Sequence, residues 1–295
     1  MLGLEIRDRY LTVVALDDEG RLRARQEVHL DADRGLATLD ALDAVAGDEP
    51  KQVGVAAMTT NGGALVDDVL RALAHRYTGS FLDEGPIPSG SAAAMAEAWT
   101  GAARPARNVV YFSVADHTTA GIVQGGTPWL GTRRRAASVG WLALNPVERE
   151  DYRKNGCLEA EVAAGGIVRR LIWRIKAGDR SRAEEMVGGD LGAITLDHVL
   201  EGAREGDGVS ISVIRDTAKY LGMAAANLVA LVDPEVLVLG GIMASASDLF
   251  LEPVRAELGK RVPKRMMDEL RLAPAELGPD AAAIGAARIA SVTRS

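Results

Sequence analysis

The chain has 295 residues, of which 47% are hydrophobic and 25% are charged, and its net charge is −7. This balance is typical of a globular protein and excludes a disordered or membrane-embedded chain. The length is sufficient for two domains with separate cores. The negative net charge repels phosphate backbones, and we interpret the one short basic run, Arg133 to Arg135, as a solvated loop, so we expect no direct nucleic-acid binding.

The cysteine content and the first residues predict a cytoplasmic protein. Cys157 is the only cysteine, so the chain can form neither an internal disulfide nor a cysteine-rich zinc site. The residues after Met1 lack the pattern of a signal peptide, and no apolar run approaches the roughly 20 residues that span a bilayer. We therefore expect no membrane association.

Strands and helices alternate in the first part of the chain. Residues 2–16 and 21–30 predict the two strands of a β-hairpin that turns at Asp17 to Gly20. Apolar spacing predicts helices over 35–46, 64–75 and 91–100, with a short buried strand over 51–58. Residues 103–108 contain a proline and two arginines and predict the connection between an N-terminal lobe, 1–105, and a C-terminal lobe, 106–295.

The second part repeats this opening. Residues 109–114 and 120–124 predict strands around a polar turn, and 236–239 predict a buried strand that runs into Gly240 and Gly241. We expect one long amphipathic helix over 158–177 with Trp173 on its apolar stripe, a buried helix over 209–232, and a final helix, about 281–295, which belongs to the C-terminal lobe or packs back on the N-terminal one. The pattern predicts an α/β protein with two related lobes around a cleft.

Several segments resemble the ROK family of repressors and sugar kinases. Leu231 to Gly241 resembles its adenosine-side motif, and further matches follow the family's order over essentially the whole chain: 92–101, 120–123, 156–160 and 274–278. The resemblance implies a two-lobed actin-like, sugar-kinase (ribonuclease H-like) fold in which ATP and sugar meet in the cleft. It also implies a homodimer.

The nucleotide side departs from the family pattern. The family's Asp-Ile-Gly-Gly-Thr turn is Glu5-Ile6-Arg7-Asp8-Arg9 here, and these bulky residues keep the backbone away from phosphates. The second glycine-rich phosphate turn has become residues 115–121, where we interpret Asp116 and His117 as a polar hairpin tip. The degenerate nucleotide side thus comprises Arg7, Asp8, Arg9, Asp116, His117, Gly240 and Gly241.

The family's catalytic base, an aspartate before the alanine-rich helix, corresponds to Ser89. A serine is no base near neutral pH, and loss of a positioned base typically costs ~10² to 10⁴ in rate. Asp83 and Glu84 lie upstream, but residues 85–88 hold them away. No catalytic residue is therefore assigned.

Sugar and zinc positions have changed as well. The family's Glu-x-Gly-His is Ser138-Val139-Gly140-Trp141 here, and of the zinc segment, matched to 150–159, one cysteine of three survives as Cys157. No zinc is expected. Glu159 matches a sugar contact or, equally, complements a helix dipole. The three tryptophans Trp141, Trp129 and Trp99 either stack on a ligand ring or belong to the core. The candidate ligand contacts are Asn61, Ser89, Ser91, Ser138, Trp141 and Glu159.

These departures predict a non-catalytic ROK-fold protein that binds an unknown small molecule or partner protein in a regulatory role. The alternative is a diverged sugar kinase for a hexose or amino sugar, which would require ATP and Mg²⁺. Repressors of the family carry a helix-turn-helix domain ahead of the first strand, and here the first strand starts at Leu2, so we do not expect direct DNA binding.

Overall fold

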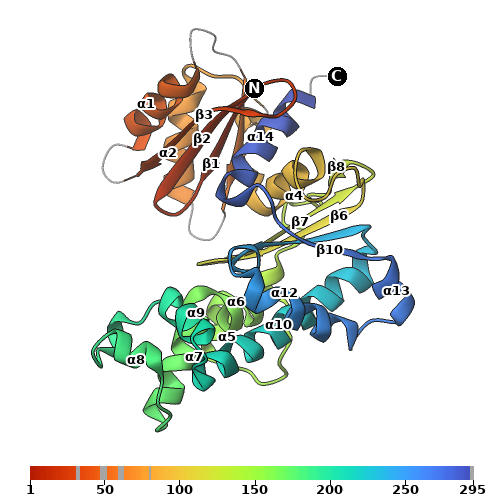
Figure 1. The fold of residues 1–295 in the computed structure, drawn as a ribbon. Helices are drawn as coiled ribbons and strands as arrows, with labels where there is room; N and C mark the ends of the chain where they lie inside the picture. Colours follow the sequence, from red (N-terminus) through yellow and green to blue (C-terminus); the bar gives the residue numbers. More distant parts are fainter. Residues whose placement is uncertain (31–33, 47–51, 59–62, 80, 293–295) are drawn as a thin grey trace. The chain divides into compact units, whose positions relative to one another are not determined.

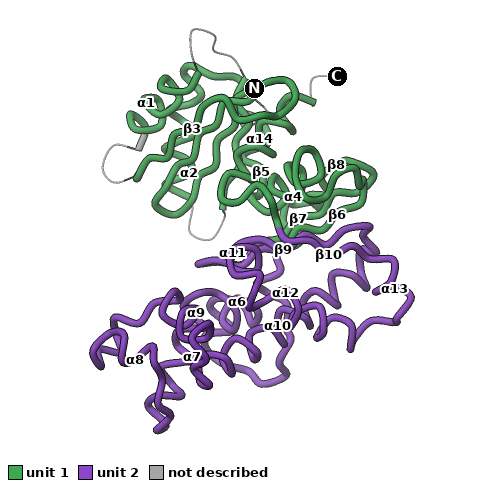
Figure 2. The backbone as a smooth tube through the Cα atoms, in the orientation of Figure 1, with its two compact units in different colours: residues 1–111, 120–137, 275–295 green, residues 112–119, 138–274 purple. Residues whose placement is uncertain are grey.

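The computed structural model describes residues 1–30, 34–46, 52–58, 63–79 and 81–292. Its contacts divide the chain into two compact units (Figure 2). Unit 1 comprises residues 1–111, 120–137 and 275–295, and unit 2 comprises residues 112–119 and 138–274. The C-terminal segment therefore belongs to the same unit as the N-terminal strands.

Unit 1 contains a five-stranded sheet in the order β3-β2-β1-β4-β5, and its first three strands are labelled in Figure 1. Strands β1 (Leu2–Ile6), β2 (Tyr10–Leu16) and β3 (Leu22–His29) are antiparallel, whereas β4 (Val53–Ala57) and β5 (Ile87–Pro88) run parallel to β1. The prediction of one strand over 2–16 was wrong, because Arg7 donates its backbone N–H to Tyr10 O at 2.8 Å and the chain reverses there.

The two faces of this sheet are covered differently. On one face lie helices α1 (Arg34–Ala46) and α2 (Gly63–Ala74). Leu42 of α1 and Leu73 of α2 belong to the same hydrophobic core as Leu4 of β1. On the other face, α14 (Ala281–Val292) packs against β1, β4 and α4 (Ser89–Trp99). A Cβ on Gly3 or Gly54 would lie 1.9 Å from a carbonyl oxygen of α14, so only glycine permits this contact.

A second five-stranded sheet has the order β10-β9-β6-β7-β8. Its strands are β6 (Val109–Val114), β7 (Thr118–Gln124), β8 (Thr127–Pro128), β9 (Val236–Gly241) and β10 (Arg271–Pro274). Strands β9 and β10 are parallel, and β7 and β8 form an antiparallel hairpin. The two sheets and their helices confirm the predicted α/β class.

Unit 2 is organised around the 25-residue helix α10 (Gly208–Val232), which contacts α6 (Cys157–Val162), α7 (Ala164–Lys176), α9 (Leu196–Arg204) and α12 (Ser247–Gly259). The predicted single helix over 158–177 was wrong. Ala163 has an extended backbone between α6 and α7, and the glycine pair that follows it favours a break. Trp173 is 71% exposed and is not part of an apolar stripe.

Short elements complete the described chain: α3 (Phe81–Glu84), α5 (Glu150–Asn155), α8 (Arg182–Met186), α11 (Ile242–Ser245), α13 (Lys264–Glu269), and the 3-10 turns η1 (Val139–Trp141), η2 (Leu191–Ala193) and η3 (Gly278–Asp280). Among the helices of the described residues, none combines the length and the apolar character needed to cross a bilayer.

Candidate functional site

The first turn, between β1 and β2, is held by its own arginine. Arg7 Nη2 donates to Thr12 Oγ1 at 2.6 Å and to Glu27 Oε2 at 3.2 Å. Asp8 and Arg9 are exposed, and none of the three turn residues has a positive φ. The turn therefore lacks the backbone conformation that glycine would allow, and the Arg7 guanidinium is already engaged by groups of the sheet.

Glu5, which stands at the family's first aspartate position, is a buried carboxylate that the sequence analysis did not single out. Glu5 is 4% exposed, and Arg7 Nε lies 3.8 Å from Glu5 Oε2. Burial raises the pKa of Glu5 above its ordinary value of 4.5, and the Arg7 charge, which lowers it, does not offset the burial. A buried acid with a raised pKa is a feature found often at functional sites.

We expect Glu5→Gln to raise the melting temperature at about pH 7 and to leave it unchanged at about pH 4. Because the folded pKa of Glu5 lies above the unfolded one, stability contributed by its neutral form is present at low pH and is lost as the pH rises through the folded pKa. The neutral amide of glutamine does not lose stability in this way as the pH rises. Melting curves of the variant and the unmodified protein between about pH 4 and pH 7 measure the difference, and Asp18→Asn on the exposed turn is the control. A variant that melts at a lower temperature than the unmodified protein at neutral pH would contradict the prediction.

The family's base position is closed by packing. Ser89 and Ser91, at the start of α4, are 5% and 1% exposed. The Ser89 hydroxyl lies near Glu5, but neither serine Oγ has hydrogen-bond geometry to a described group. Glu84, considered as a substitute base, instead pairs with Arg134 at 3.0 Å. Asn61 lies outside the described residues.

The second turn is joined to the start of α6. His117 Nδ1 lies 2.8 Å from Glu159 Oε1, and the Thr118 N–H donates to Glu159 Oε2 at 2.6 Å. The Thr118 hydroxyl donates to the same oxygen. Asp116 is exposed at the tip. His117 is therefore more than a polar hairpin tip: it lies against a carboxylate 42 residues away, a partner that no local pattern indicated.

Segment η1, which matches the family's sugar motif, packs tightly against this pair. A Cβ on Gly140 would lie 2.9 Å from Thr118 Oγ1 and 3.4 Å from Glu159 Oε2. Gly156 has φ +96°, and a Cβ there would lie 2.2 Å from Gly140 O, so both glycines are required by close approach. Ser138 is exposed at the start of η1. Glu159 thus lies in the first turn of α6, with both oxygens bound by β7 and the turn before it.

A hollow of about 210 Å³ opens beside η1. Its wall includes Trp141, which is 60% exposed, and the buried residues Tyr152 and Cys157. The family resemblance places the zinc-binding histidine at Trp141 and the three zinc-binding cysteines at Glu150, Tyr152 and Cys157, so three of these four positions lie at the hollow. The fourth, Glu150, pairs with Lys154 at 2.7 Å. The part of the chain that the structure describes contains no group of three His, Cys, Asp or Glu residues placed to hold a metal ion.

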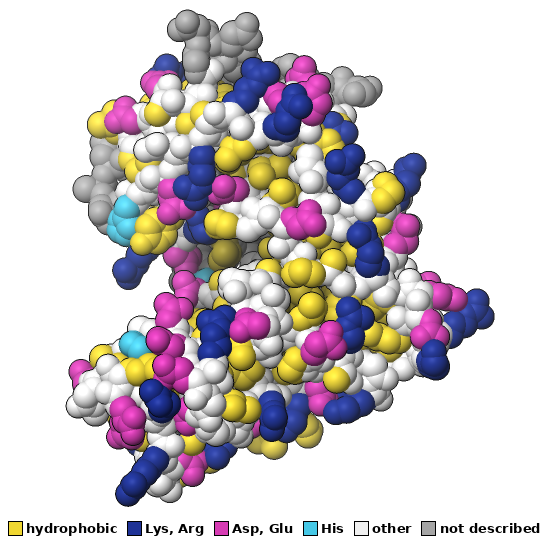
Figure 3. Space-filling view, viewed as in Figure 1, with side chains coloured by type: hydrophobic (Ala, Val, Ile, Leu, Met, Phe, Trp, Pro, Cys, Tyr) yellow, Lys and Arg dark blue, Asp and Glu magenta, His cyan; other side chains and the backbone are white. Residues whose placement is uncertain are grey.

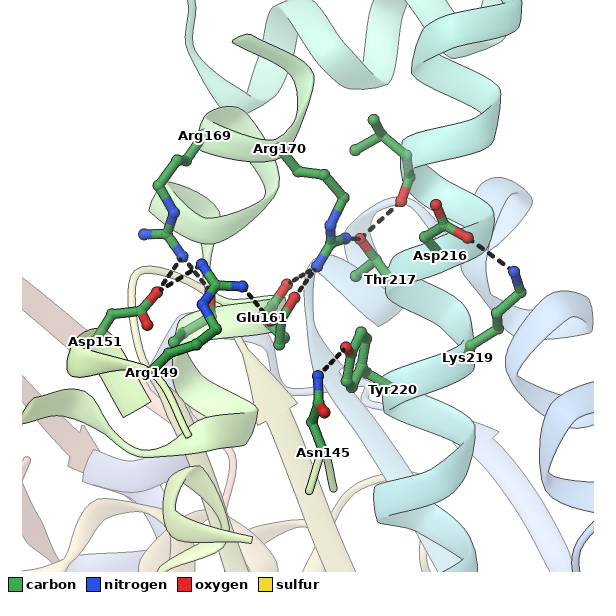
Figure 4. Close-up of polar contacts among 12 residues, drawn as sticks. Asn145, Arg149, Asp151, Glu161, Arg169, Arg170, Asp216, Thr217, Lys219 and Tyr220 are labelled. Carbon is green, nitrogen blue, oxygen red and sulfur yellow. Dashed lines mark hydrogen bonds and ion pairs between the residues drawn. The ribbon is translucent and has the colours of Figure 1, made fainter. Parts of the chain in front are cut away.

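Glu161 is bonded to two residues that line this hollow, Arg149 and Tyr152. Its buried carboxylate accepts hydrogen bonds from Arg149 Nη1 at 3.3 Å and from Arg170 Nη2 at 2.5 Å, both drawn in Figure 4. It also accepts a hydrogen bond from Tyr152 Oη. Arg170 also donates to Thr217 Oγ1 on α10 at 2.9 Å. Burial and the bond to Glu161 raise the pKa of Tyr152, so its hydroxyl remains the donor.

Of the two remaining nucleotide-side glycines, Gly240 lies buried in β9 and Gly241 has a packing role. Gly241 ends β9 with φ +60°, and a Cβ there would lie 1.9 Å from Val114 O. Of the three tryptophans considered for ring stacking, Trp141 alone lines the hollow described above. The Trp99 ring is covered by the Arg288 guanidinium, 4.7 Å from the ring centroid, and Trp129 is half exposed in unit 1.

Comparison with known proteins identifies the family. The sequence model of the ROK family matches residues 90–292. The chain belongs to the ROK family. A glucokinase of Halalkalibacterium halodurans is 31% identical over 198 residues, which cover 65% of this chain and 59% of that protein. The DNA-binding transcriptional dual regulator NagC of Escherichia coli is 26% identical over 185 residues, which cover 62% of this chain and 44% of the regulator.

The fold agrees with solved ROK structures. The crystal structure of a ROK family glucokinase from Streptomyces griseus, in complex with glucose and AMPPNP, superposes with a TM-score of 0.79 at 21% identity and covers 99% of both chains. This ROK protein therefore has the actin-like sugar-kinase fold that the motifs predicted. Its sequence relatives include kinases and regulators, and the alignments span 59% and 44% of the two relatives named above.

Proposed function

We propose that this ROK protein does not transfer phosphate and instead binds a small molecule in a regulatory or interaction role. The observation that supports this most strongly is the bonding of His117 and Thr118 to Glu159. The family resemblance assigns the second turn to phosphates and the glutamate to the sugar. Here these groups satisfy each other, so the polar groups expected for two substrates are engaged within the protein.

The first turn supports the same proposal. Arg7 fills the position of a phosphate-binding glycine and bonds to Thr12 and Glu27, and Ser89 provides no base. A phosphoryl-transfer site acts by positioning and by electrostatic stabilisation of one transition state, so loss of the phosphate turns and of the base removes most of its effect.

The hollow beside Trp141 is the proposed ligand site. About 210 Å³ is below the roughly 300 Å³ at which drug-sized pockets begin, and fits one small ring. An exposed indole offers an apolar face for stacking, while Asn145, Glu148 and Arg153 add polar groups at the wall. A monosaccharide has both an apolar face and hydroxyls, and the glucokinase relative makes it the first class to test.

Location, assembly and cofactor content belong to the same proposal. We propose a cytoplasmic homodimer that works without zinc or nucleotide. Direct nucleic-acid binding is not part of it, because the net charge is −7 and Arg134, the central arginine of the run 133–135, is paired with Glu84.

A second candidate function is a diverged sugar kinase. The observation in its favour is the His117–Glu159 contact, since a carboxylate at Nδ1 orients an imidazole for acid–base chemistry. ATP turnover separates the two candidates.

We expect millimolar MgATP to produce almost no melting shift, whereas one or more monosaccharides produce a shift that Trp141→Ala abolishes. A ligand at 100 times its Kd, binding only the folded state, adds about 2.7 kcal/mol of stability, so melting curves detect binding of either kind. Trp129→Ala, which removes an exposed indole of unit 1, should leave the monosaccharide shift intact.

A coupled assay for ADP release, with and without hexoses and amino sugars, completes the test. Ser89→Asp restores an acid at the base position and should not restore phosphorylation, because the phosphate turns remain blocked. Sugar-dependent ADP release by the unmodified protein would overturn the proposal and establish the second candidate.

A further inference from the structure

Helix α7 presents an aromatic residue between cations to solvent. Arg169, Trp173 and Lys176 are spaced four and three residues apart, so they lie on one face of the helix, and all three are exposed. Arg180 follows, also exposed, just beyond the end of the helix. We call these four residues the α7 face. Trp173, at 71% exposure, is more exposed than either Trp129 or Trp141.

This face is locally cationic in an acidic chain. Residues 169–182 contain six arginines and lysines against one carboxylate, Asp179, a net +5 in a chain of net −7. Over the surface drawn in Figure 3, acidic and basic side chains are interspersed. Three of the six cations are held by close ion pairs: Arg170 with Glu161, Arg174 with Asp179, and Arg182 with Glu205.

Two of the cations of the α7 face are less engaged. Arg169 pairs with Asp151 at 3.3 Å (Figure 4) and donates to Ala160 O at 2.7 Å, so the less engaged cations are Lys176 and Arg180. Lys176 and Arg180 form no ion pair with a residue of the described part of the chain. Cations in the last turn of a helix complement its dipole, which accounts for Arg174 and Lys176. The dipole does not account for an indole exposed between positive charges.

We propose that the α7 face docks an acidic segment of a partner protein, with an apolar side chain of that segment covering Trp173. Tryptophan and arginine are the residues enriched at binding hot spots, and the positive charge selects an acidic sequence. A second copy of this chain would bring cations against cations across a two-fold axis. Nucleic acid and anionic membranes require larger cationic surfaces and are repelled by the net charge of −7. This inference holds whether or not the chain is a kinase.

The test uses the full chain and a fluorescein-labelled synthetic peptide rich in Asp and Glu around a central Leu. Binding is measured by fluorescence anisotropy at about 0.15 M salt, because this salt concentration screens weak long-range attraction between charges. We expect saturable binding that Trp173→Ala weakens about tenfold or more, and that Lys176→Glu combined with Arg180→Glu weakens at least as much. The matched control, Lys264→Glu with Arg265→Glu on α13, makes the same change in charge and should alter the Kd less than about twofold.

Four results would overturn the proposal. Equal losses in both double variants would mean general attraction of a polyanion, and absence of peptide binding to the unmodified chain would mean that the face takes no acidic segment. Binding of phosphatidylserine vesicles or duplex DNA that Trp173→Ala abolishes, without peptide binding, would assign the face to a membrane or nucleic acid. Self-association in sedimentation that the same variant abolishes would assign it to a second copy. Circular dichroism checks that each variant is folded.

Discussion

Replacing Glu161 with alanine is expected to lower the free energy of unfolding by about 3–5 kcal/mol, because removing one partner of a buried ion pair leaves the other charge uncompensated. The Glu161 carboxylate joins Tyr152 and Arg149 to Arg170, and Arg170 connects the group to α10. Chemical denaturation measures the loss, and a melting temperature lower by roughly 10 °C should accompany it. Glu161→Gln keeps the side-chain shape and one acceptor oxygen, so it should lower the free energy of unfolding by less than Glu161→Ala does.

The matched control for Glu161 lies in the same view (Figure 4). Asp216 and Lys219 form an exposed pair on α10 at 2.8 Å, and Asp216→Ala should cost less than about 1 kcal/mol. A structural zinc would contribute folding free energy directly. We propose that the bonds of Glu161, and not a zinc ion, hold this segment together. A chelator should therefore leave the melting temperature of the unmodified protein unchanged. Unfolding by chelator, or an equally small effect of both substitutions, would contradict this account.

Periodicity predicted the long elements well and the breaks poorly. The helix predicted over 209–232 is α10, within one residue of Gly208–Val232, because its apolar residues continue for many turns. The chain reversal at Arg7 was missed since no glycine or proline marks it. The break at Ala163 was missed because the apolar spacing carries on through it, and the exposure of Trp173 cannot be read from a spacing that ignores what packs against the helix.

The candidate site shows a different limit. Motif matching assigned the second turn to phosphates and Glu159 to a sugar contact, but it left open whether the glutamate contacts a ligand or complements a helix dipole. The His117–Glu159 and Thr118–Glu159 bonds depend on folding that joins positions some forty residues apart, and nothing local in either segment indicates them. Glu161 was missed for the same reason: a buried carboxylate looks like a surface one until its partners are known.

Motif matching was most informative where matched segments meet. Residues 92–101 and 274–278 resemble the family separately, and Glu97 of the first bonds to the backbone of the second: its Oε1 accepts the N–H groups of Glu276 and Leu277 at 3.1 and 3.0 Å. Two segments that resemble the family separately are therefore in contact in this fold.

Glu97→Ala is accordingly expected to destabilise unit 1 strongly, by at least about 3 kcal/mol. The carboxylate is fully buried and also accepts the Ala102 N–H at 2.8 Å, so its loss leaves three backbone donors without an acceptor, each costing ~1–3 kcal/mol when buried. Glu97→Gln should recover only part of this, because its NH₂ group must face at least one donor. Glu276→Ala is the matched control: it removes an exposed side chain and keeps the N–H that Glu97 accepts, so denaturation should show a change within about 0.5 kcal/mol. If Glu97→Ala is no more destabilising than this control, water replaces the carboxylate and the contact does not hold the scaffold.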